Sequence, residues 1–315
     1  MDRRGCHGDI AVEPEISLIV PAYNEEDSVG PLYQEILTHV PPLGRAFEVL
    51  FVDDGSRDRT SARLRRLAER DDRVRVIKLR RNYGQTPAMV AGIDHARGAI
   101  LVTMDADLQN DPADIGQLLE KLDEGYDIVV GWRHDRQDKW LSRKLPSVLA
   151  NRLIALVTGV RVRDNGCTLK AFRADLIRAV PLYGEMHRFI PAMTSIAGCR
   201  LAEIAVSHHP RRFGQSKYGL SRIYKVCLDL MAIKTLLLFT RRPLFCFFGS
   251  AAITGLLSLG AVVWMLRQVA LDGPEAAVVP MVILLLFASL AIFLVLAGLI
   301  VSLAYRTFLE AAGEG

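Results

Sequence analysis

Two carboxylates stand one residue apart at the point where a run of apolar residues ends. The segment LVTM (101–104) leads directly into Asp105 and Asp107, with Ala106 between them. Because neighbouring carboxylates repel each other, the pair favours a positive partner, either a metal ion or a basic side chain, although water alone could separate them. An isolated pair of this kind is also a common turn or helix cap, so its chemistry depends on the residues near it.

Five short apolar runs alternate with stretches of helical pattern in the first part of the chain. The runs predict strands at 15–23, 47–56, 73–79, 98–107 and 126–132. The segments between them predict helices over 60–70, about 86–96 and 114–124. Strands separated by helices of this length predict an α/β domain with a mostly parallel sheet, and strands that are apolar almost throughout fit a sheet covered on both faces.

Polar residues end several of the predicted strands. They are Tyr23, Asn24 and Glu25; Asp53 and Asp54; Asp105, Asp107 and Gln109; and Arg133. Because the carboxyl ends of parallel strands meet at one edge of a sheet, where ligands bind, we expect these side chains to converge. Oxygen ligands without a Cys or His cluster favour Mg²⁺ or Mn²⁺ over zinc, and Mg²⁺ commonly binds one or two carboxylates plus substrate phosphates. The sequence therefore predicts a site for a metal ion and a diphosphate-bearing ligand.

Not every acid in this region is expected to bind metal. Asp111 precedes Pro112, and we expect it to be a local stop, that is, a turn or cap residue at the end of an element. The five cysteines have no metal-type spacing, which favours free thiols in a reducing compartment. The net charge of +4 gives no support to a nucleic-acid partner, whereas a basic face toward anionic lipid is consistent with it.

Two long uncharged segments predict a membrane hairpin. Residues 243–266 form a run of 24 without charge and residues 276–305 a run of 30. A membrane-spanning helix needs about 20 predominantly apolar residues. Buried core helices are the alternative, but the length and all-round apolarity disfavour it. Lys and Arg flank the outer ends, while the connection 267–275 has one Arg and two acids, so the positive-inside rule places both termini in the cytoplasm.

Two further segments bear on the membrane. Residues 221–239 have charged residues on one helical face and apolar residues on the other, as in an interfacial helix or in a helix packed on the catalytic domain. The first 15 residues are charged and have no apolar centre, so they do not read as a secretory signal peptide. The expected location is the inner (plasma) membrane, with a multi-pass chain and a cytoplasmic catalytic domain.

Three motifs in order strongly resemble family 2 glycosyltransferases, which have the GT-A nucleotide-sugar fold. They are SLIVPAYNEE (17–26), VDDGSRDRT (52–60) and NYGQTPAMVAGIDHARGAILVTMDADLQNDP (82–112). The segments QNDP, GWR and RRFGQSKY resemble the polyprenyl-phosphate sugar transferases, a branch that includes dolichyl-phosphate mannose synthase, bactoprenol glucosyltransferases and aminoarabinose transferases. The resemblance covers about residues 15–225, and the two C-terminal spans match bacterial members as well.

The resemblance implies roles for individual residues on the donor side. It assigns the nucleobase and ribose to a set of residues on two strand ends, namely Pro21, Tyr23, Glu25, Val52 and Asp54. Asp105 and Asp107, with Ala106 between them, match the D-x-D that binds metal and donor, and Gln109 matches the polar residue that completes the metal site.

On the acceptor side, the resemblance implies that Arg133 faces the donor or acceptor phosphate. Arg211, Ser216 and Lys217 match R-x-x-G-x-S-K, a basic loop suited to a departing diphosphate, although a solvated loop at the membrane surface is the alternative. Asp164 matches an acid that has been considered as a base, but an Asp before Asn-Gly is also a common turn residue. Many relatives carry a second acid where this chain has Cys167, which weakens a base at that position.

The sequence as a whole predicts an inverting, metal-dependent glycosyltransferase. It would move a sugar from a nucleoside diphosphate, UDP by family prevalence, to a polyprenyl phosphate, undecaprenyl phosphate in a bacterium, with Asp107, Asp164, Arg211 and Lys217 as catalytic residues. The predicted parts are a tail (1–14), a GT-A catalytic domain (15–220), a juxtamembrane helix region (221–242), a transmembrane hairpin (243–305) and a cytoplasmic tail (306–315).

Two alternatives remain open at this point. A processive polysaccharide synthase shares the fold, but it would normally carry a Q-x-x-R-W motif and more spans. A non-catalytic membrane partner that only binds a nucleotide sugar is the other, and the intact D-x-D and R-x-x-G-x-S-K motifs disfavour it. The sugar and the oligomeric state, a homo-oligomer included, are not readable from the sequence.

Overall fold

The computed structural model describes residues 13–134 and 243–313 and, between these ranges, 151–210 with gaps at 153, 157, 181, 183–185 and 197, together with 212 and 231. The chain divides into two compact units, Met1–Leu230 and Met231–Gly315. The boundary between them falls inside the segment that the sequence predicts to be a juxtamembrane helix.

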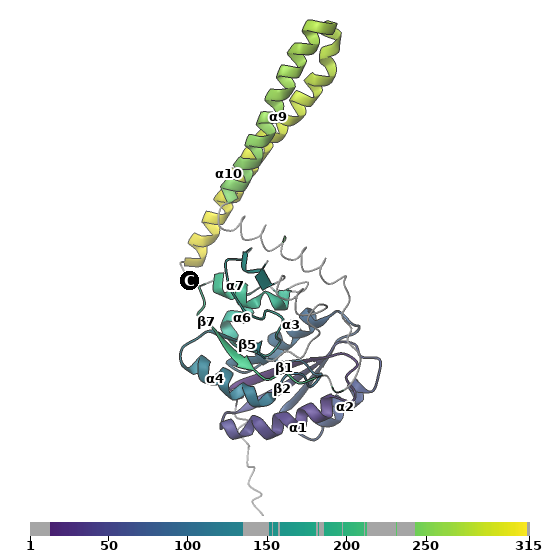
Figure 1. The fold of residues 1–315 in the computed structure, drawn as a ribbon, viewed down its shortest axis with the longest axis vertical. Helices are drawn as coiled ribbons and strands as arrows, with labels where there is room; N and C mark the ends of the chain where they lie inside the picture. The colour runs from purple at the N-terminus through teal and green to yellow at the C-terminus, as the bar shows by residue number, and fades with distance from the viewer. Residues whose placement is uncertain are drawn as a thin grey trace, which may run out of the picture. The chain divides into compact units, whose positions relative to one another are not determined.

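A seven-stranded sheet forms the centre of the first unit (Figure 1). Its strands are β1 (Ile16–Ala22), β2 (Phe47–Asp53), β3 (Val74–Lys78), β4 (Ile100–Thr103), β5 (Ile128–Arg133), β6 (Lys170–Arg173) and β7 (Leu201–Val206). They lie in the order β3-β2-β1-β4-β6-β5-β7, and β6 pairs antiparallel with both β4 and β5. The pairs β1–β2, β1–β4, β2–β3 and β5–β7 are parallel.

The mostly parallel sheet confirms the fold expected from the sequence. All five predicted strands are present, and the predicted helices correspond to Thr60–Ala68, Gln85–His95 and Ile115–Asp123. Strands β6 and β7 were not predicted from the sequence. Because β6 is antiparallel to both neighbours, β5 still runs in the direction of β4. The carboxyl ends of β4 and β5 therefore share an edge with the first residue of β6.

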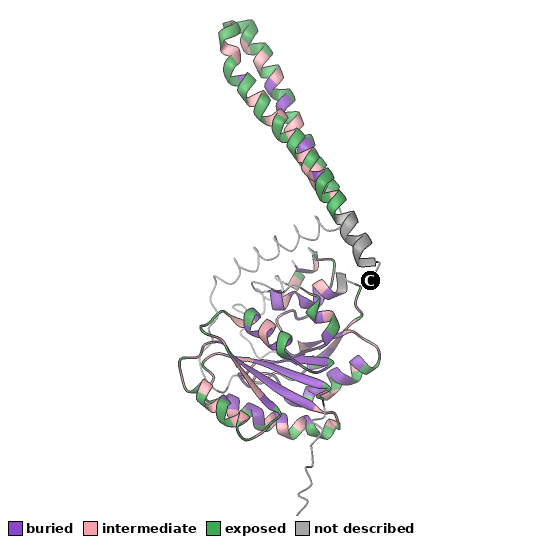
Figure 2. Cartoon of the chain, turned by 180° about the vertical axis from the view of Figure 1, so that it is seen from behind, coloured by how far each residue is buried: buried purple, intermediate pink, exposed green. Residues whose placement is uncertain are grey.

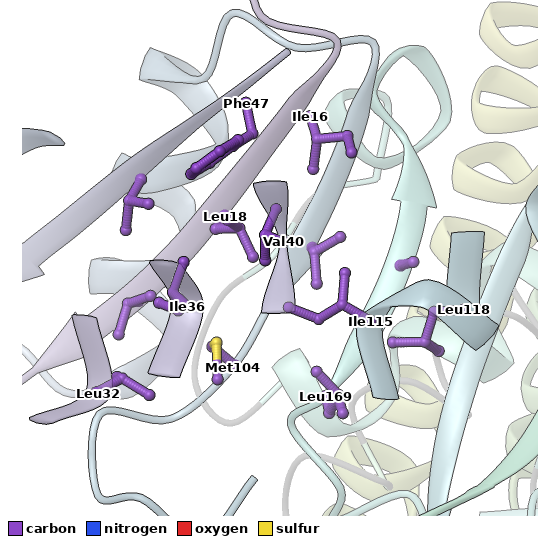
Figure 3. Close-up of a cluster of buried hydrophobic side chains, with 14 of the residues drawn as sticks. Ile16, Leu18, Leu32, Ile36, Val40, Phe47, Met104, Ile115, Leu118 and Leu169 are labelled. Carbon is purple, nitrogen blue, oxygen red and sulfur yellow. The ribbon is translucent and has the colours of Figure 1, made fainter. Parts of the chain in front are cut away.

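Helices cover both faces of the sheet (Figure 1). They are α1 (Val29–His39), α2 (Thr60–Ala68), α3 (Gln85–His95), α4 (Ile115–Asp123), α6 (Ala174–Arg178) and α7 (Ile190–Ile196), with short 3₁₀ turns η1 (Pro41–Leu43), η2 (Pro112–Asp114) and η4 (Met186–Arg188). Buried residues of α1, α2 and α4 join one apolar cluster (Figure 3), whereas those of α3, α6 and α7 join a second cluster on the opposite face.

The central strands are apolar along their whole length because both of their faces are covered. In β1, Leu18 and Val20 pack into the first cluster, whereas Ile19, between them, packs into the second. All three side chains are fully buried, and Figure 2 shows the strands as a buried layer between partly exposed helices. Burial of a Leu, Val or Ile side chain contributes about 1.5–3 kcal/mol, so this layer fixes the strand ends that carry the polar residues.

The second unit is a pair of long apolar helices, α9 (Pro243–Asp272) and α10 (Val278–Gly313), joined by η5 (Pro274–Ala277). Both are long and apolar enough to cross a membrane, by length and composition. Most of their large apolar side chains are exposed, as the predominantly exposed surface of the pair in Figure 2 shows. The two helices touch closely near Gly298, where an added Cβ would lie 2.7 Å from Phe247 Cβ.

Gly55 provides a test of the packing at the carboxyl edge of β2. It has φ +69°, and an added Cβ would lie 2.4 Å from the backbone carbon of Arg81. Gly44 has a similar φ of +70° but nothing within 4 Å of its added Cβ. The backbone conformation alone makes a non-glycine residue unfavourable by about 1–2 kcal/mol. We therefore predict that Gly55→Ala lowers the Tm of the purified protein clearly more than Gly44→Ala does. Equal shifts for the two variants would contradict the close approach of the 79–83 loop.

Candidate active site

The D-x-D turn follows β4 and encloses both of its carboxylates, Asp107 more fully than Asp105. Asp107 is 6 % exposed, and Asp105 is partly exposed. Leu108, the next residue, is buried and has φ 61°, a left-handed conformation that glycine adopts far more readily. The backbone N–H of Gln109 donates to Asp107 Oδ1 at 3.2 Å. Backbone strain of this kind is held in place by surrounding contacts and is concentrated at functional sites.

Asp105 is held by three different segments of the chain. The side-chain amide of Gln85, at the start of α3, donates to Asp105 Oδ1 at 2.7 Å. The Thr168 hydroxyl donates to Asp105 Oδ2 at 2.8 Å, and the Asp105 backbone N–H donates to Asn110 Oδ1 at 3.1 Å. Burial, together with the charge of Asp107, raises the pKa of the Asp105 carboxyl above its usual range. The turn therefore concentrates negative charge in fixed positions.

The side chains of the turn fit the divalent metal that the sequence predicts. Among the described residues, no three side chains of His, Cys, Asp or Glu come together as a metal site; the predicted set has two carboxylates and one amide. The Gln109 Nε2 donates to the His209 carbonyl at 3.5 Å, which leaves its Oε1 as the ligand atom. Carboxylate and amide oxygens suit Mg²⁺ or Mn²⁺, and a cation between Asp105 and Asp107 would offset the repulsion that raises the Asp105 pKa. The assignment of these three residues stays a prediction.

The residues predicted to hold the nucleobase and ribose lie on neighbouring strand ends. Pro21 of β1 and Val52 of β2 stand opposite each other in the parallel register, and Val52 is fully buried. Tyr23 and Glu25, in the loop after β1, are partly exposed. The Glu25 backbone N–H donates to Thr60 Oγ1 at 2.8 Å, which fixes this loop to the start of α2. The structure thus brings the predicted set together at one edge, while its role stays a prediction.

A second set of contacts joins the loops after β1 and β2. Asn24 has φ 55°; its backbone N–H donates to Ser56 Oγ at 3.0 Å, and its Oδ1 accepts from the Arg57 backbone N–H at 2.8 Å. Asp53 Oδ1 accepts from the Ser56 backbone N–H at 2.8 Å, as expected of a turn residue before Gly-Ser. These bonds give Asn24 and Asp53 a structural role at the edge.

Asp54 connects the edge that is predicted to bind the nucleobase to the start of α3. Its buried carboxylate accepts from the backbone N–H groups of Tyr83 and Gly84, at 2.8 and 2.9 Å, and from Asn82 Nδ2 at 2.9 Å. Gly84 has φ +101° and directly precedes Gln85, which bonds Asp105. Burial raises the pKa of Asp54, while the hydrogen bonds from Tyr83 and Gly84 act in the opposite direction. Asp54 therefore positions a loop that reaches the D-x-D turn.

Arg133 and Asp164 form a bidentate ion pair. Arg133 Nε lies 2.6 Å from Asp164 Oδ2 and its Nη2 lies 2.9 Å from Oδ1. The Gly166 backbone N–H donates to Asp164 Oδ1 at 3.1 Å, so Asp164 also closes the turn that its position before Asn-Gly suggested. Burial alone would lower the pKa of Arg133, but the hydrogen bonds to Asp164 and its charge raise it. The structure brings together two residues that the sequence analysis had placed in separate roles.

The segment that leads toward the predicted basic loop pairs with the residues after the D-x-D. His208 forms an isolated antiparallel bridge with Asn110, and the His209 backbone N–H donates to the Gln109 carbonyl at 3.0 Å. The chain at 207–210 is fixed beside the predicted metal ligands.

Asp111 caps η2, as expected of a local stop, and also fixes this segment. Its Oδ1 accepts from the Ala113 backbone N–H at 2.9 Å, and its Oδ2 lies 3.0 Å from His209 Nε2. Asp114 contributes a further bond, since its Oδ2 accepts from the Ser207 backbone N–H at 2.7 Å. The motif QNDP therefore holds two distant parts of the chain together.

A buried polar group on the other face of the sheet was not predicted from the sequence. Lys170 is 2 % exposed, and its Nζ donates to the His187 carbonyl at 3.4 Å. His187 Nδ1 lies 2.6 Å from the Thr86 hydroxyl. Burial lowers the pKa of Lys170 to about 8 and lowers the pKa of His187 well below its usual value. Burial also raises the pKa of the nearby Cys167 thiol, to about 11. The only sequence signal was a lysine at the start of a four-residue segment, KAFR (170–173), whose two middle residues are apolar.

Three predicted residues, Arg211, Ser216 and Lys217, lie outside the described part of the chain, as does nearly all of the segment 221–239. Their roles stay predictions. Arg212, next to Arg211, is described and exposed. Three of the five cysteines, at 167, 199 and 246, are described, and all three are free.

Comparison with known proteins identifies the family. The model of the family Glycosyl transferase family 2 matches residues 17–180. A dodecaprenyl-phosphate galacturonate synthase of Rhizobium johnstonii is 45 % identical over 256 residues, which are 80 % of this chain and 74 % of that protein. An undecaprenyl-phosphate 4-deoxy-4-formamido-L-arabinose transferase of Edwardsiella ictaluri is 40 % identical over 280 residues, 89 % of this chain and 84 % of that protein.

Solved structures agree on the fold. Glucosyl-3-phosphoglycerate synthase from Mycobacterium tuberculosis, solved with Mn²⁺, UDP and glucosyl-3-phosphoglycerate, matches with a TM-score of 0.53 at 18 % identity, covering 70 % of this chain and 78 % of that chain. A second structure of that enzyme, with Mg²⁺ and UDP, also has a TM-score of 0.53, at 20 % identity over 69 % and 79 % of the two chains. With the sheet order and the family match, these findings establish that the chain is a member of glycosyltransferase family 2, with the GT-A fold.

Proposed function

We propose that the protein transfers a sugar from a nucleoside diphosphate to the phosphate of a polyprenyl lipid, with inversion at the anomeric carbon. The nucleoside diphosphate that we expect is UDP. The two relatives named for this reaction, with dodecaprenyl and undecaprenyl phosphate, are 45 % and 40 % identical to this chain. The single observation that carries the proposal is the convergence of Asp105, Asp107 and the Arg133–Asp164 pair at one edge of the sheet, beside Pro21 and Val52.

Each part of this edge suits one part of a nucleotide sugar. The loops after β1 and β2 offer a partly exposed surface for a nucleobase, and the D-x-D turn offers carboxylates for a metal. A bound Mg²⁺ or Mn²⁺ would act as a Lewis acid on the leaving diphosphate. The enzyme of M. tuberculosis with the same fold was solved with UDP and either ion, which supports this choice. The predicted loop of Arg211, Ser216 and Lys217 would add positive charge to the leaving group.

The acceptor requires no side chain to remove a proton. The second pKa of a phosphate monoester is about 6, so the lipid phosphate is mostly dianionic at neutral pH. In the structure, both oxygens of Asp164 accept hydrogen bonds from Arg133. A carboxylate engaged in this way is suited to orienting a guanidinium toward a phosphate rather than to acting as a general base.

A direct assay tests this function. The purified protein is incubated with undecaprenyl phosphate, Mg²⁺ and a panel of UDP- and GDP-sugars, and the lipid fraction is analysed by mass spectrometry. We expect one sugar to appear on the lipid phosphate, with the UDP-sugars as the productive set. Sugar polymer without a glycosyl lipid, or no product with any donor, would contradict the proposal.

The predicted metal ligands give the first of three predictions that follow from this function. Asp107→Ala and Asp105→Ala should each lower kcat by at least about 10²-fold, by analogy with removal of one electrostatic stabiliser at a reacting centre. EDTA should abolish the activity of the unchanged protein. Asp94→Ala is the matched control, because Asp94 is exposed on α3 away from the turn, and it should leave kcat unaffected. Full activity of Asp107→Ala would show that the D-x-D is not the metal site.

The second prediction concerns Asp164. Because the acceptor phosphate is the group that ionises near pH 6, Asp164→Asn should lower kcat/KM without altering the acidic limb of its pH profile. Loss of rate follows from the loss of the bidentate contact with Arg133. Measurements from about pH 5 to 8 on both proteins decide the question. A variant whose rate no longer falls at low pH would identify Asp164 as the essential base.

The third prediction concerns topology. We propose that α9 and α10 cross the inner membrane and that the first unit and the C-terminus are cytoplasmic, since the basic residues flank the outer ends of the hairpin. Reporter fusions at Gly273 and Gly315 should then report opposite sides, with Gly273 outside. A fusion at Gly315 that reports the same side as Gly273 would rule out a two-span hairpin.

A further inference from the structure

Lys170 lies at the edge of the sheet that carries the D-x-D turn. As the first residue of the antiparallel β6, it stands opposite Thr103, the last residue of β4, and opposite Val130 of β5. Thr168, two residues earlier, bonds Asp105. Phe172, two residues later on the same strand, packs into the cluster formed with α3, α6 and α7, which places Lys170 on that face of the sheet.

The ammonium group of Lys170 is buried with little to stabilise its charge. Within the described ranges, its one hydrogen bond is to the His187 carbonyl, at 3.4 Å, and no carboxylate lies within ion-pair distance of Nζ. An ammonium carries three donors, so two of them have no protein acceptor in this part of the chain. A buried cation without a counter-ion is unfavourable for folding, and such groups are retained where a ligand supplies the missing charge.

The nearest negative groups are committed elsewhere. Asp105 and Asp164 lie near enough to act on Lys170 electrostatically, and Arg188 opposes them. Asp164 is paired with Arg133 through both of its oxygens. Asp105 accepts hydrogen bonds on both oxygens and belongs to the predicted metal set. Lys170 therefore contributes a positive charge beside the D-x-D turn that no ion pair within the described ranges neutralises.

We propose that Lys170 is a substrate-binding residue whose ammonium group binds an anionic oxygen of the nucleotide-sugar donor, either on the diphosphate or on a carboxylate carried by the sugar. This inference rests on the proposed function. The donor is favoured over the acceptor because the residues around Lys170 are connected to Asp105. His187, whose carbonyl accepts from Lys170, contacts Thr86. The neighbour of Thr86, Gln85, donates a hydrogen bond to Asp105.

The experiment measures donor binding and stability on the full-length protein in Mg²⁺. Dissociation constants for undecaprenyl phosphate and for the four nucleotides UDP, GDP, UDP-glucose and UDP-galacturonate are determined for the unchanged protein and for Lys170→Met, Lys170→Gln and Lys121→Met. Lys121 is a partly exposed lysine of α4 paired with Glu124, so its variant is the matched control. The Tm of each protein is measured without ligand.

We expect Lys170→Met and Lys170→Gln to bind the donor at least about tenfold more weakly, since both variants lose a hydrogen bond between charged groups. The ligand-free Tm should not fall in Lys170→Met, because the variant removes a buried charge that has no partner. Lys121→Met should bind as the unchanged protein does. Equal weakening for UDP and both UDP-sugars assigns the contact to the diphosphate, whereas weakening for UDP-galacturonate alone assigns it to the carboxylate.

Other results would overturn the inference. Unchanged dissociation constants in both Lys170 variants, with or without a lower Tm, would make Lys170 a structural residue. Weakened binding of undecaprenyl phosphate with unchanged donor binding would remove it from the donor site. Failure of the unchanged protein to bind any of the four nucleotides would instead overturn the proposed function, and the inference with it.

Discussion

Two like charges held side by side at the end of a buried strand are the constraint around which the first unit is organised. Asp105 and Asp107 repel each other in a partly buried turn, and Leu108 adopts a left-handed backbone to keep both carboxylates in place. The two carboxylates and the left-handed Leu108 backbone keep these positions only if contacts from other parts of the chain hold them. Gln85 from α3, Thr168 before β6 and the backbone after the turn supply those contacts.

Two chains of contacts extend from this turn to the rest of the edge. In the first chain, Asp54 accepts a hydrogen bond from the backbone of Gly84 and so fixes the loop that ends there. The next residue, Gln85, donates a hydrogen bond to Asp105. In the other, the residues after the D-x-D bond the segment 207–210, from which the predicted basic loop departs. Nucleobase, metal and leaving-group functions would therefore be positioned by one connected set of hydrogen bonds, supported by the buried layer of strands.

The strands and the meeting of their polar ends could be predicted from the sequence because both follow from the pattern of apolar and polar residues along the chain. Apolar runs such as 47–53 are buried on both faces, and their polar ends meet at one edge because β1, β2, β4 and β5 run the same way. Contacts between distant segments could not be read in this way. The pairing of Asp164 with Arg133 depends on the insertion of the antiparallel β6, a strand of four residues without a distinctive pattern. The second role of Asp111 and the burial of Lys170 depend on the same tertiary arrangement.

Above all, we infer that the D-x-D carboxylates bind a divalent ion and that this ion binds the donor diphosphate. A structure of the protein with Mn²⁺ and UDP tests it most directly, because anomalous scattering locates manganese independently of the polypeptide. We expect one Mn²⁺ within about 2.0–2.6 Å of a carboxylate oxygen of the D-x-D and of a diphosphate oxygen, the range of hard oxygen ligands. UDP bound at this edge with manganese elsewhere, or with no ion at the D-x-D, would contradict it.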